Sequence, residues 1–154
     1  MKIGIASDHA GYELKEYIKK RFIEEGIQHD LIDFGTYDSR SVDYPDFASK
    51  VASNVSRGSL NAGILICGTG IGMCIVANKY PGVRAGIAYS DEVASLLKRH
   101  NNVNVLCLGG RTMDYETAFK RVLTWLNEEF EGGRHERRIN KISKLEVEIC
   151  RSYK

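Results

Sequence analysis

The sequence predicts an α/β fold, a single-domain α/β/α sandwich with a five-stranded parallel sheet. Short apolar runs rich in Val, Ile and Leu alternate with segments of helical period. Five such strand–helix units follow one another, which implies right-handed crossovers and helices on both faces of the sheet. The chain has 154 residues, which suits one domain with one full core. We therefore expect residues 1–154 to form one Rossmann-like domain, with a C-terminal helix added.

The expected strands are the apolar runs at residues 3–7, 28–34, 62–67, 83–89 and 104–109. The first helix ends near Gly26 and has one apolar face made by Leu14, Tyr17, Ile18 and Phe22. The second begins at Pro45 and repeats apolar groups at Ala48, Val51, Ala52 and Val55. The third follows the glycines after Cys67.

A capping signal places the fourth helix, and an apolar face indicates the fifth. Ser90 precedes Asp91 and Glu92, and this pattern predicts a fourth helix that runs to about His100. The fifth helix covers residues 114–130 and turns inward Phe119, Val122, Leu123, Leu126 and Phe130.

The last helix, over residues 134–150, belongs to no strand–helix unit. It follows Gly132 and Gly133, and its apolar stripe consists of Ile139, Ile142, Leu145 and Ile149. Such a terminal amphipathic helix can dock on its own domain or on a second subunit, and the sequence favours neither alternative.

Composition excludes several classes of protein. The chain is 43% hydrophobic and 27% charged, as ordinary globular proteins are, and its net charge of +2 is too small for a field that holds nucleic acid. Residues 134–154 nevertheless contain seven basic and three acidic side chains. A short cationic segment on a neutral body suits a small anion.

The cysteines and the N-terminus predict a reduced, cytoplasmic, soluble protein without a metal site. The four cysteines form no CxxC pair and have no histidine at zinc-ligand spacing. The apolar start is too short for a signal peptide, and no apolar run approaches about 18 residues. We therefore expect no cofactor, no metal and no membrane partner.

Three polar segments follow expected strands at their carboxyl ends, where ligands bind in parallel sheets. They are Asp8 to Gly11, Cys67 to Gly72 and Gly109 to Arg111. The middle segment, CGTGIG, has no Lys for a P-loop, gives GxGxG where a dinucleotide site needs GxGxxG, and has Met73 where a low-molecular-weight phosphatase loop needs Arg. The interpretation that remains is an oxyanion-binding loop with a thiol at its entrance.

A thiolate beside an oxyanion cradle is suited to removing a proton next to a carbonyl and holding the enediolate. Each candidate also has a structural alternative. Cys67 can be a packed strand end, His9 a helix cap and His100 a residue that interacts with a helix dipole. Arg134 and Arg138 lie four residues apart on one helical face, which suits either one phosphate or a solvated surface.

Six ordered motifs along nearly the whole chain resemble those of the B-type ribose-5-phosphate isomerases, which are grouped with galactose-6-phosphate isomerase subunits. The motifs are DHAG, SVDYP, CGTGIG, ANK, HNN and EGGRHERR. The resemblance implies a metal-free aldose-ketose isomerase of the pentose phosphate pathway that interconverts D-ribose 5-phosphate and D-ribulose 5-phosphate. It also implies a homodimer, which can pair into a tetramer.

The resemblance also implies a role for each site residue. Cys67 is the expected base, since the glutamate base of some relatives is replaced here by Met73. Thr69 orients the sugar, His100 is the acid that opens the furanose ring, and Asn101 binds a hydroxyl. The remaining substrate-binding residues are Asp8, His9, Tyr44, Gly68, Gly70, Ile71 and Gly72, with the phosphate held by Arg111, Arg134 and Arg138.

Two other functions compete with this one. A hexose-6-phosphate isomerase for allose or galactose phosphate would use the same proton transfer. A flavodoxin-like sensor that binds a phosphorylated ligand would need the arginines and glycines but has no use for Cys67 together with His100.

Chain direction predicts a site shared between subunits. Cys67 directly follows a strand, whereas the fourth helix runs back antiparallel to the strands and carries His100 toward the opposite edge. We therefore expect each active site to join Cys67 of one subunit to His100 and Asn101 of the other, and leave open which subunit supplies the arginines.

Overall fold

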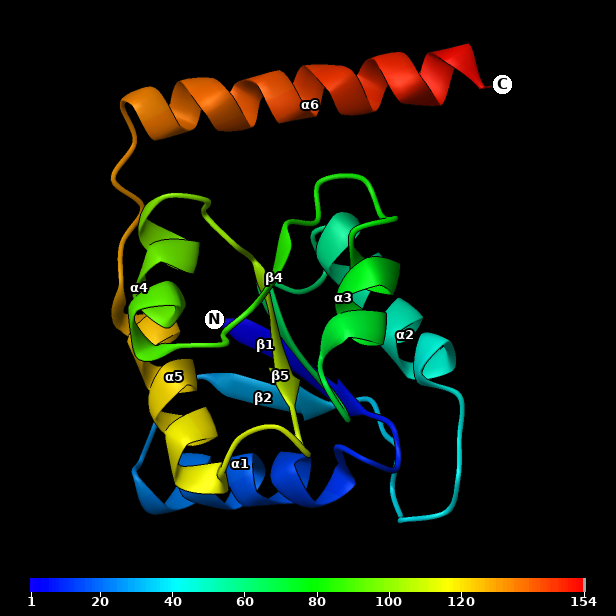
Figure 1. Ribbon diagram of the computed structural model, residues 1–154, viewed down its shortest axis with the longest axis vertical. Coiled ribbons are helices and arrows are strands. Elements are labelled where there is room, and N and C mark those ends of the chain that lie inside the picture. The colour runs from blue at the N-terminus through cyan, green and yellow to red at the C-terminus, as the bar shows by residue number, and fades with distance from the viewer. Residues whose placement is uncertain (154) are drawn as a thin grey trace.

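The computed structural model describes residues 1–153 and contains one five-stranded sheet and six helices in that range (Figure 1). The strands are β1 (Lys2–Ser7), β2 (Asp30–Asp33), β3 (Ala62–Cys67), β4 (Ala85–Ile87) and β5 (Val105–Gly109). The helices are α1 (Tyr12–Glu24), α2 (Tyr44–Ser56), α3 (Ile71–Ala77), α4 (Asp91–Arg99), α5 (Tyr115–Asn127) and α6 (Arg134–Ser152).

The sheet is parallel throughout, as predicted, with strand order β2-β1-β3-β5-β4. β1, β3 and β5 are therefore neighbours at its centre. Their registers pair Ser7 with Ile66 and Cys67 with Gly109, so the three strands end side by side. This register brings the three polar segments of the sequence to one edge of the sheet.

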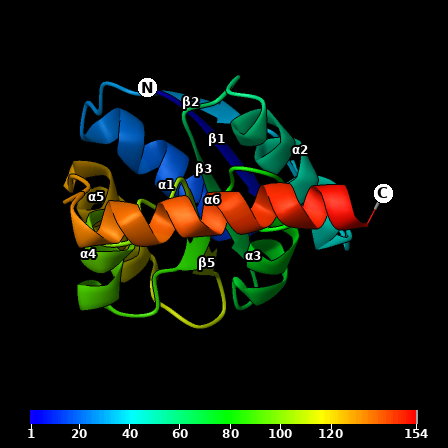
Figure 2. The same ribbon diagram turned by 90° about the horizontal axis from the view of Figure 1, so that it is seen from above.

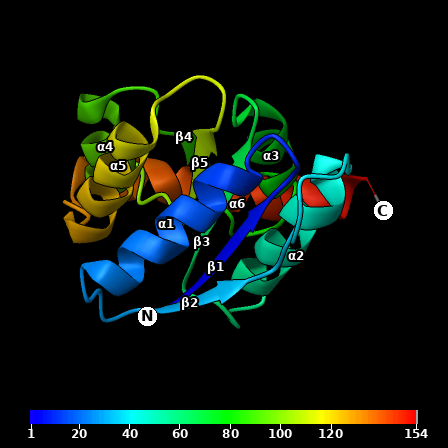
Figure 3. The same ribbon diagram turned by 90° about the horizontal axis from the view of Figure 1, so that it is seen from below.

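Helices cover both faces of the sheet. Figure 3 shows α1, α4 and α5 on one side of the strands and α2 and α3 on the other. The first face encloses a core with Trp125, whose indole N–H donates to the Val103 carbonyl at 2.9 Å. The second core includes Val51, Leu65 and Met73. Burial of these apolar side chains supplies most of the driving force for folding.

Local signals account for the starts of two helices. Ser90 caps α4 by accepting from the Val93 N–H at 3.1 Å, and Asp114 caps α5 by accepting from the Thr117 N–H at 2.9 Å. Each cap satisfies a backbone donor that otherwise lacks a partner in the helix and contributes about 1 kcal/mol.

Several predicted bounds are too wide. The expected strands 28–34 and 83–89 shorten to Asp30–Asp33 and Ala85–Ile87, because both are edge strands that pair on one side only. The fifth helix ends at Asn127 rather than at residue 130. Glu128 is extended (ψ 154°), so Phe130 lies beyond the helix and Trp125 fills the core.

Helix α6 lies across one end of the molecule (Figures 1 and 2). Its first turns contact the body through the buried His135 and Ile139, and the Glu146 carboxylate accepts from the Gly82 N–H at 3.0 Å. The rest of the predicted stripe stays more than half exposed, at Ile142, Leu145 and Ile149. Its apolar face is therefore not covered by its own chain. None of the helices formed by residues 1–153 has the length and apolar character needed to cross a membrane.

Candidate active site

The three loops that follow β1, β3 and β5 are joined by backbone hydrogen bonds. The Gly110 N–H donates to the Cys67 carbonyl at 2.8 Å, and the Arg111 N–H donates to the Gly68 carbonyl at 3.0 Å. The Asp8 N–H donates to the Ile66 carbonyl at 3.2 Å. These bonds hold the loops as one surface at the carboxyl edge of the sheet.

The Cys67 thiol sits inside the glycine loop. The side chain is 5% exposed, and its Sγ accepts from the Gly70 N–H at 3.2 Å. Gly70 has φ +83°, a left-handed conformation that favours glycine, and this turn brings its N–H back over the thiol. The loop therefore encloses the thiol and places a backbone N–H donor against its sulfur.

Thr69 and Tyr44 shape the entrance to this loop. The Thr69 Oγ1 accepts from the Ile71 N–H at 3.2 Å, at the start of α3. Tyr44 begins α2 and packs its ring on Gly72, where an added methyl group would lie 2.7 Å from the ring atoms. Glycine at position 72 therefore allows the aromatic ring to line the loop.

Asp8 and His9 hold the first loop. The buried Asp8 accepts through Oδ1 from the N–H groups of Ala10 and Gly11, at 2.9 and 3.1 Å. The Nδ1 of His9 lies 3.2 Å from both the N and the O of Val42, so this ring does not cap α1. The alternative of a helix-capping His9 is therefore wrong.

Arg111 brings a positive charge to the same edge. Its exposed side chain passes beside Gly68, where an added methyl group would lie 3.6 Å from Cδ and 3.7 Å from Nη1. We call this set of loop residues the carboxyl-edge cluster: Asp8, His9, Tyr44, Cys67, Gly68, Thr69, Gly70, Ile71, Gly72 and Arg111.

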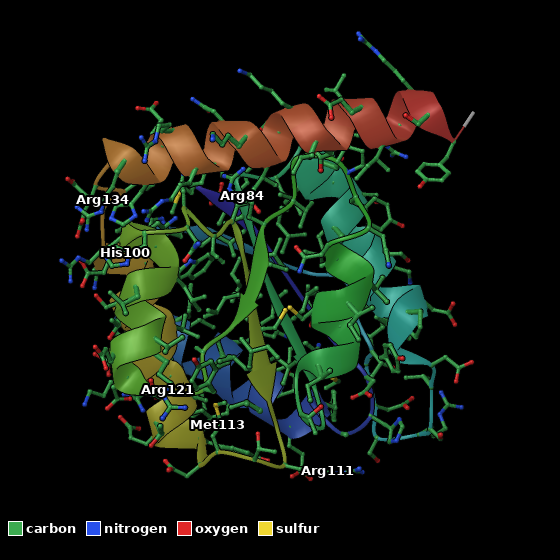
Figure 4. The ribbon with its side chains drawn as sticks, turned by 45° about the horizontal axis from the view of Figure 1, so that its top comes forward. Arg84, His100, Arg111, Met113, Arg121 and Arg134 are labelled. Atoms are coloured by element: carbon green, nitrogen blue, oxygen red, sulfur yellow. The ribbon has the colours of Figure 1, made fainter. Side chains whose placement is uncertain are left out.

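The other predicted residues lie elsewhere. His100 follows the last residue of α4, and Figure 4 shows it beside Arg134 at the opposite end of the molecule from Arg111. Asn101 follows His100, and Arg138 is one turn beyond Arg134 on α6. We call His100, Asn101, Arg134 and Arg138 the amino-edge cluster. Within one chain, His100 and Cys67 thus lie at opposite edges of the sheet, as chain direction predicts.

Two residues of the EGGRHERR motif, to which sequence reasoning gave no role, lie against His100. Its ring stacks on that of His135, with centroids 4.1 Å apart and an interplanar angle of 12°. Glu131 lies between them and is bound by Arg99 at 2.6 Å. Glu131 and His135 lie four residues apart, on either side of two glycines. This spacing is the sequence signal that could have identified the two residues.

Burial and charge shift the pKa of these two groups. Burial lowers the pKa of His135, and the nearby His100 and Arg134 lower it further, against the opposing effect of Glu131. The hydrogen bond from Arg99 holds the pKa of Glu131 below its ordinary value, although burial acts in the other direction. These two shifts favour the neutral imidazole of His135 and the ionised carboxylate of Glu131.

The fold and the carboxyl-edge cluster define a class: an α/β protein with a buried thiol in a glycine-rich loop at the carboxyl edge of a parallel sheet. The chain belongs to the Ribose/Galactose Isomerase family, whose model matches residues 3–142. Ribose-5-phosphate isomerase B of Escherichia coli is 43% identical over 145 residues, which are 94% of this chain and 96% of the relative.

Solved structures agree with this assignment. The Clostridium thermocellum ribose-5-phosphate isomerase B has a TM-score of 0.92 and 47% identity, and the match covers 97% of this chain and 99% of that one. The Mycoplasma genitalium ribose-5-phosphate isomerase B, solved with bound ribulose 5-phosphate, has a TM-score of 0.90 and 45% identity, with 96% and 97% covered.

Proposed function

We propose that this chain is an aldose-ketose isomerase that interconverts D-ribose 5-phosphate and D-ribulose 5-phosphate, a step of the pentose phosphate pathway. The observation that carries the proposal is the Cys67 thiol, which is buried in a glycine loop and accepts the Gly70 N–H. Membership of the Ribose/Galactose Isomerase family supports it.

The proton transfer needs one base and one anion cradle. The Cys67 thiolate removes the proton from C2 of the open-chain aldose, and the electron pair moves to the carbonyl oxygen to give an enediolate. The hydroxyl proton on O2 passes to O1, and the same sulfur returns the proton to C1, which yields the ketose and regenerates the thiolate. Backbone N–H groups of Gly68 to Gly72 stabilise the developing charge, and Thr69 orients the sugar. Asp8, His9 and Tyr44 hold the substrate.

The reaction also needs ring opening and a phosphate site, which this chain carries at its other end. His100 protonates the ring oxygen, Asn101 binds a hydroxyl, and Arg134 and Arg138 bind the phosphate. Because the structure separates these residues from Cys67, a complete site requires two chains. We infer a homodimer in which Cys67 of one subunit meets His100 of the partner subunit.

The C-terminal helix supports this assembly. Ile142, Leu145 and Ile149 are 52%, 55% and 56% exposed, so the stripe on α6 offers an apolar face to a second copy. Arg134 and Arg138 belong to the same helix as this stripe and accompany His100, whereas Arg111 stays with Cys67. A pair of such dimers gives a tetramer, and residues 1–154 act as one isomerase domain.

The chemistry requires no cofactor and no metal. The four cysteines are unpaired thiols, which fits a cytoplasmic enzyme kept reduced. The near-neutral charge fits a small phosphorylated sugar as partner rather than nucleic acid.

A direct assay tests the proposal. The purified protein, dialysed against a chelator, is incubated with ribose 5-phosphate, and ketose formation is followed. Turnover that is retained in the chelator and abolished in Cys67→Ala supports the proposal. Absence of turnover with ribose 5-phosphate, together with turnover of allose 6-phosphate or with binding alone, rejects it in favour of the two competing functions.

A further inference from the structure

Three side chains that ligate metals face one another between the end of α4 and the start of α6. Among residues 1–153, the ligand atoms of His100, Glu131 and His135 all lie within 4.8 Å of one another. The Nε2 atoms of His135 and His100 lie 3.6 and 3.8 Å from the same Glu131 oxygen, Oε2. Figure 4 shows His100 beside Arg134, the first residue of α6.

One atom of this group is buried without a hydrogen-bond partner. The His135 side chain is 8% exposed, and no protein group within residues 1–153 hydrogen-bonds its Nε2. Its distance to the Glu131 carboxylate exceeds that of a hydrogen bond. A buried polar atom without a partner costs free energy, and a bound ligand removes that cost.

The Glu131 carboxylate is oriented toward the imidazoles. Arg99 donates to Oε1 through Nε at 2.7 Å, and its Nη2 lies 2.6 Å from the same oxygen as an ion pair. The Glu131 N–H donates to the Arg99 carbonyl at 3.0 Å. These bonds fix the glutamate and leave Oε2 facing His100 and His135. Hydrogen bonds of this kind, from a neighbouring side chain to a ligand, orient the carboxylate ligands of metal ions.

We propose that His100, Glu131 and His135 bind one divalent transition-metal ion of the zinc class. Two imidazole nitrogens and one carboxylate oxygen form a common three-ligand zinc set that leaves the fourth position to water. Imidazole ligands favour Zn²⁺, Co²⁺ or Ni²⁺ over Mg²⁺ and Ca²⁺.

The distances fit such an ion. Zinc bonds of 2.0 to 2.2 Å in a tetrahedron separate ligand atoms by about 3.3 Å, and two of the observed separations are 3.6 and 3.8 Å. The stacked rings, 12° from parallel, must tilt so that their lone pairs converge. Ion binding therefore draws the Glu131 carboxylate a few tenths of an ångström closer to each imidazole and opens the stack.

Neighbouring charges limit the affinity. Arg99 binds the same glutamate, and Arg134 and Arg138 act electrostatically on His135. Because these cations oppose a metal ion, we expect micromolar, reversible binding. The functional consequence rests on the proposed function: an ion on His100 occupies the nitrogen that carries the ring-opening proton, so the metal inhibits and a chelator restores activity.

Cobalt titration of the intact protein, without substrate, tests the site. We expect one Co²⁺ per chain, with visible bands of nitrogen and oxygen ligation and no thiolate charge-transfer band. His135→Gln and Glu131→Gln should each weaken binding at least tenfold. Glu131 is exposed, so its variant keeps the fold, which circular dichroism checks. The matched control is His29→Gln, which removes the histidine beside the N-terminal amine and should leave binding unchanged.

The proposal is overturned by the absence of saturable binding, by binding that neither His135→Gln nor Glu131→Gln affects, or by a thiolate band that assigns the ion to cysteine. Loss of binding in His29→Gln would place the ion at the N-terminal amine and also overturn it. Because no substrate is present, these outcomes are independent of isomerase activity. Cobalt binding by a protein that fails the ribose 5-phosphate assay would reject the proposed function and keep the metal site.

Discussion

The imidazole ring of His100 stacks on that of His135, with ring centroids 4.1 Å apart. This contact fixes the start of α6 against the end of α4. Arg134 lies in the same first turn of α6, so the contact also places it beside His100 (Figure 4). The proposed acid and the proposed phosphate ligands therefore form one unit at the amino edge, and the proposed base lies at the other edge of the sheet.

Replacement of the proposed base should impair the chemical step. Because the Cys67 thiolate moves the proton itself, Cys67→Ser should lower kcat by about 10²-fold or more and leave KM nearly unchanged. Steady-state kinetics with ribose 5-phosphate measure both. Near-normal turnover of the variant would rule out the thiol mechanism.

Alkylation gives a second measurement of the same thiol. Iodoacetamide should inactivate the enzyme, and substrate should slow the inactivation because it covers Cys67. Cys150 is exposed on α6, so Cys150→Ser should be inactivated at the same rate as the wild type. If Cys150→Ser resists the reagent, alkylation of Cys150 rather than of Cys67 causes the inactivation of the wild type.

Substitutions in the proposed phosphate site should change mainly KM. Replacing Arg134 or Arg138 by Ala removes a charge-assisted hydrogen bond, and each change should raise KM by an amount that corresponds to about 1.5 to 3 kcal/mol. Inorganic phosphate should compete with substrate. The matched control is Arg137→Ala, an exposed arginine of the same helix that should keep the wild-type KM. If all three variants keep the wild-type KM, Arg134 and Arg138 do not bind the phosphate and form only a solvated surface.

The central part of the fold follows from local sequence patterns. The runs that become β1, β3 and β5 are apolar on both faces, and the glycines after Cys67 mark the turn into α3. The shared edge of these strands follows from parallel pairing alone. The carboxyl-edge cluster was therefore predictable from the sequence.

Two features depend on contacts between distant segments and could not be predicted. Lys15 sits on α1 beside the apolar stripe and is fully buried, because its ammonium group donates to the Asp33 carboxylate on β2 at 2.6 Å and forms an ion pair with it. Glu131 meets His100 and His135 only because the segment after α5 folds back onto the end of α4. Helical period carries no information about either pairing.

The Lys15–Asp33 pair should make stability depend on pH. Burial raises the pKa of Asp33, but hydrogen bonds from Lys15 and Lys19 outweigh it, so the pKa is lowered. A carboxyl group whose pKa is lowered by folding stabilises the folded protein at pH values above its pKa in the unfolded chain, about 3.9. That contribution is lost as the pH falls through the pKa of the folded state. Stability should therefore decline below about pH 4.

The variant Asp33→Asn isolates this pair. It leaves Lys15 buried without its main counter-ion and should lower the free energy of unfolding at pH 7 by on the order of 3 kcal/mol. Urea unfolding at a series of pH values measures the difference, which should shrink as the wild-type carboxylate protonates. A difference that stays constant down to pH 3 would show that the ion pair does not control acid stability.

The shared site should be visible by complementation. Cys67 and His100 lie at opposite edges of one chain, so each proposed site takes one of them from each subunit. When inactive Cys67→Ala and His100→Ala proteins exchange subunits at random, half of the dimers are mixed, and each mixed dimer has one intact site of two. About a quarter of wild-type activity should return.

The matched control mixes Cys67→Ala with Thr69→Ala, whose lesions lie in the same cluster, and should recover nothing beyond the residual activity of each variant. If the first mixture stays inactive although mass spectrometry shows mixed dimers, each chain builds its own site, and the separation of His100 from Cys67 must close by movement within one subunit.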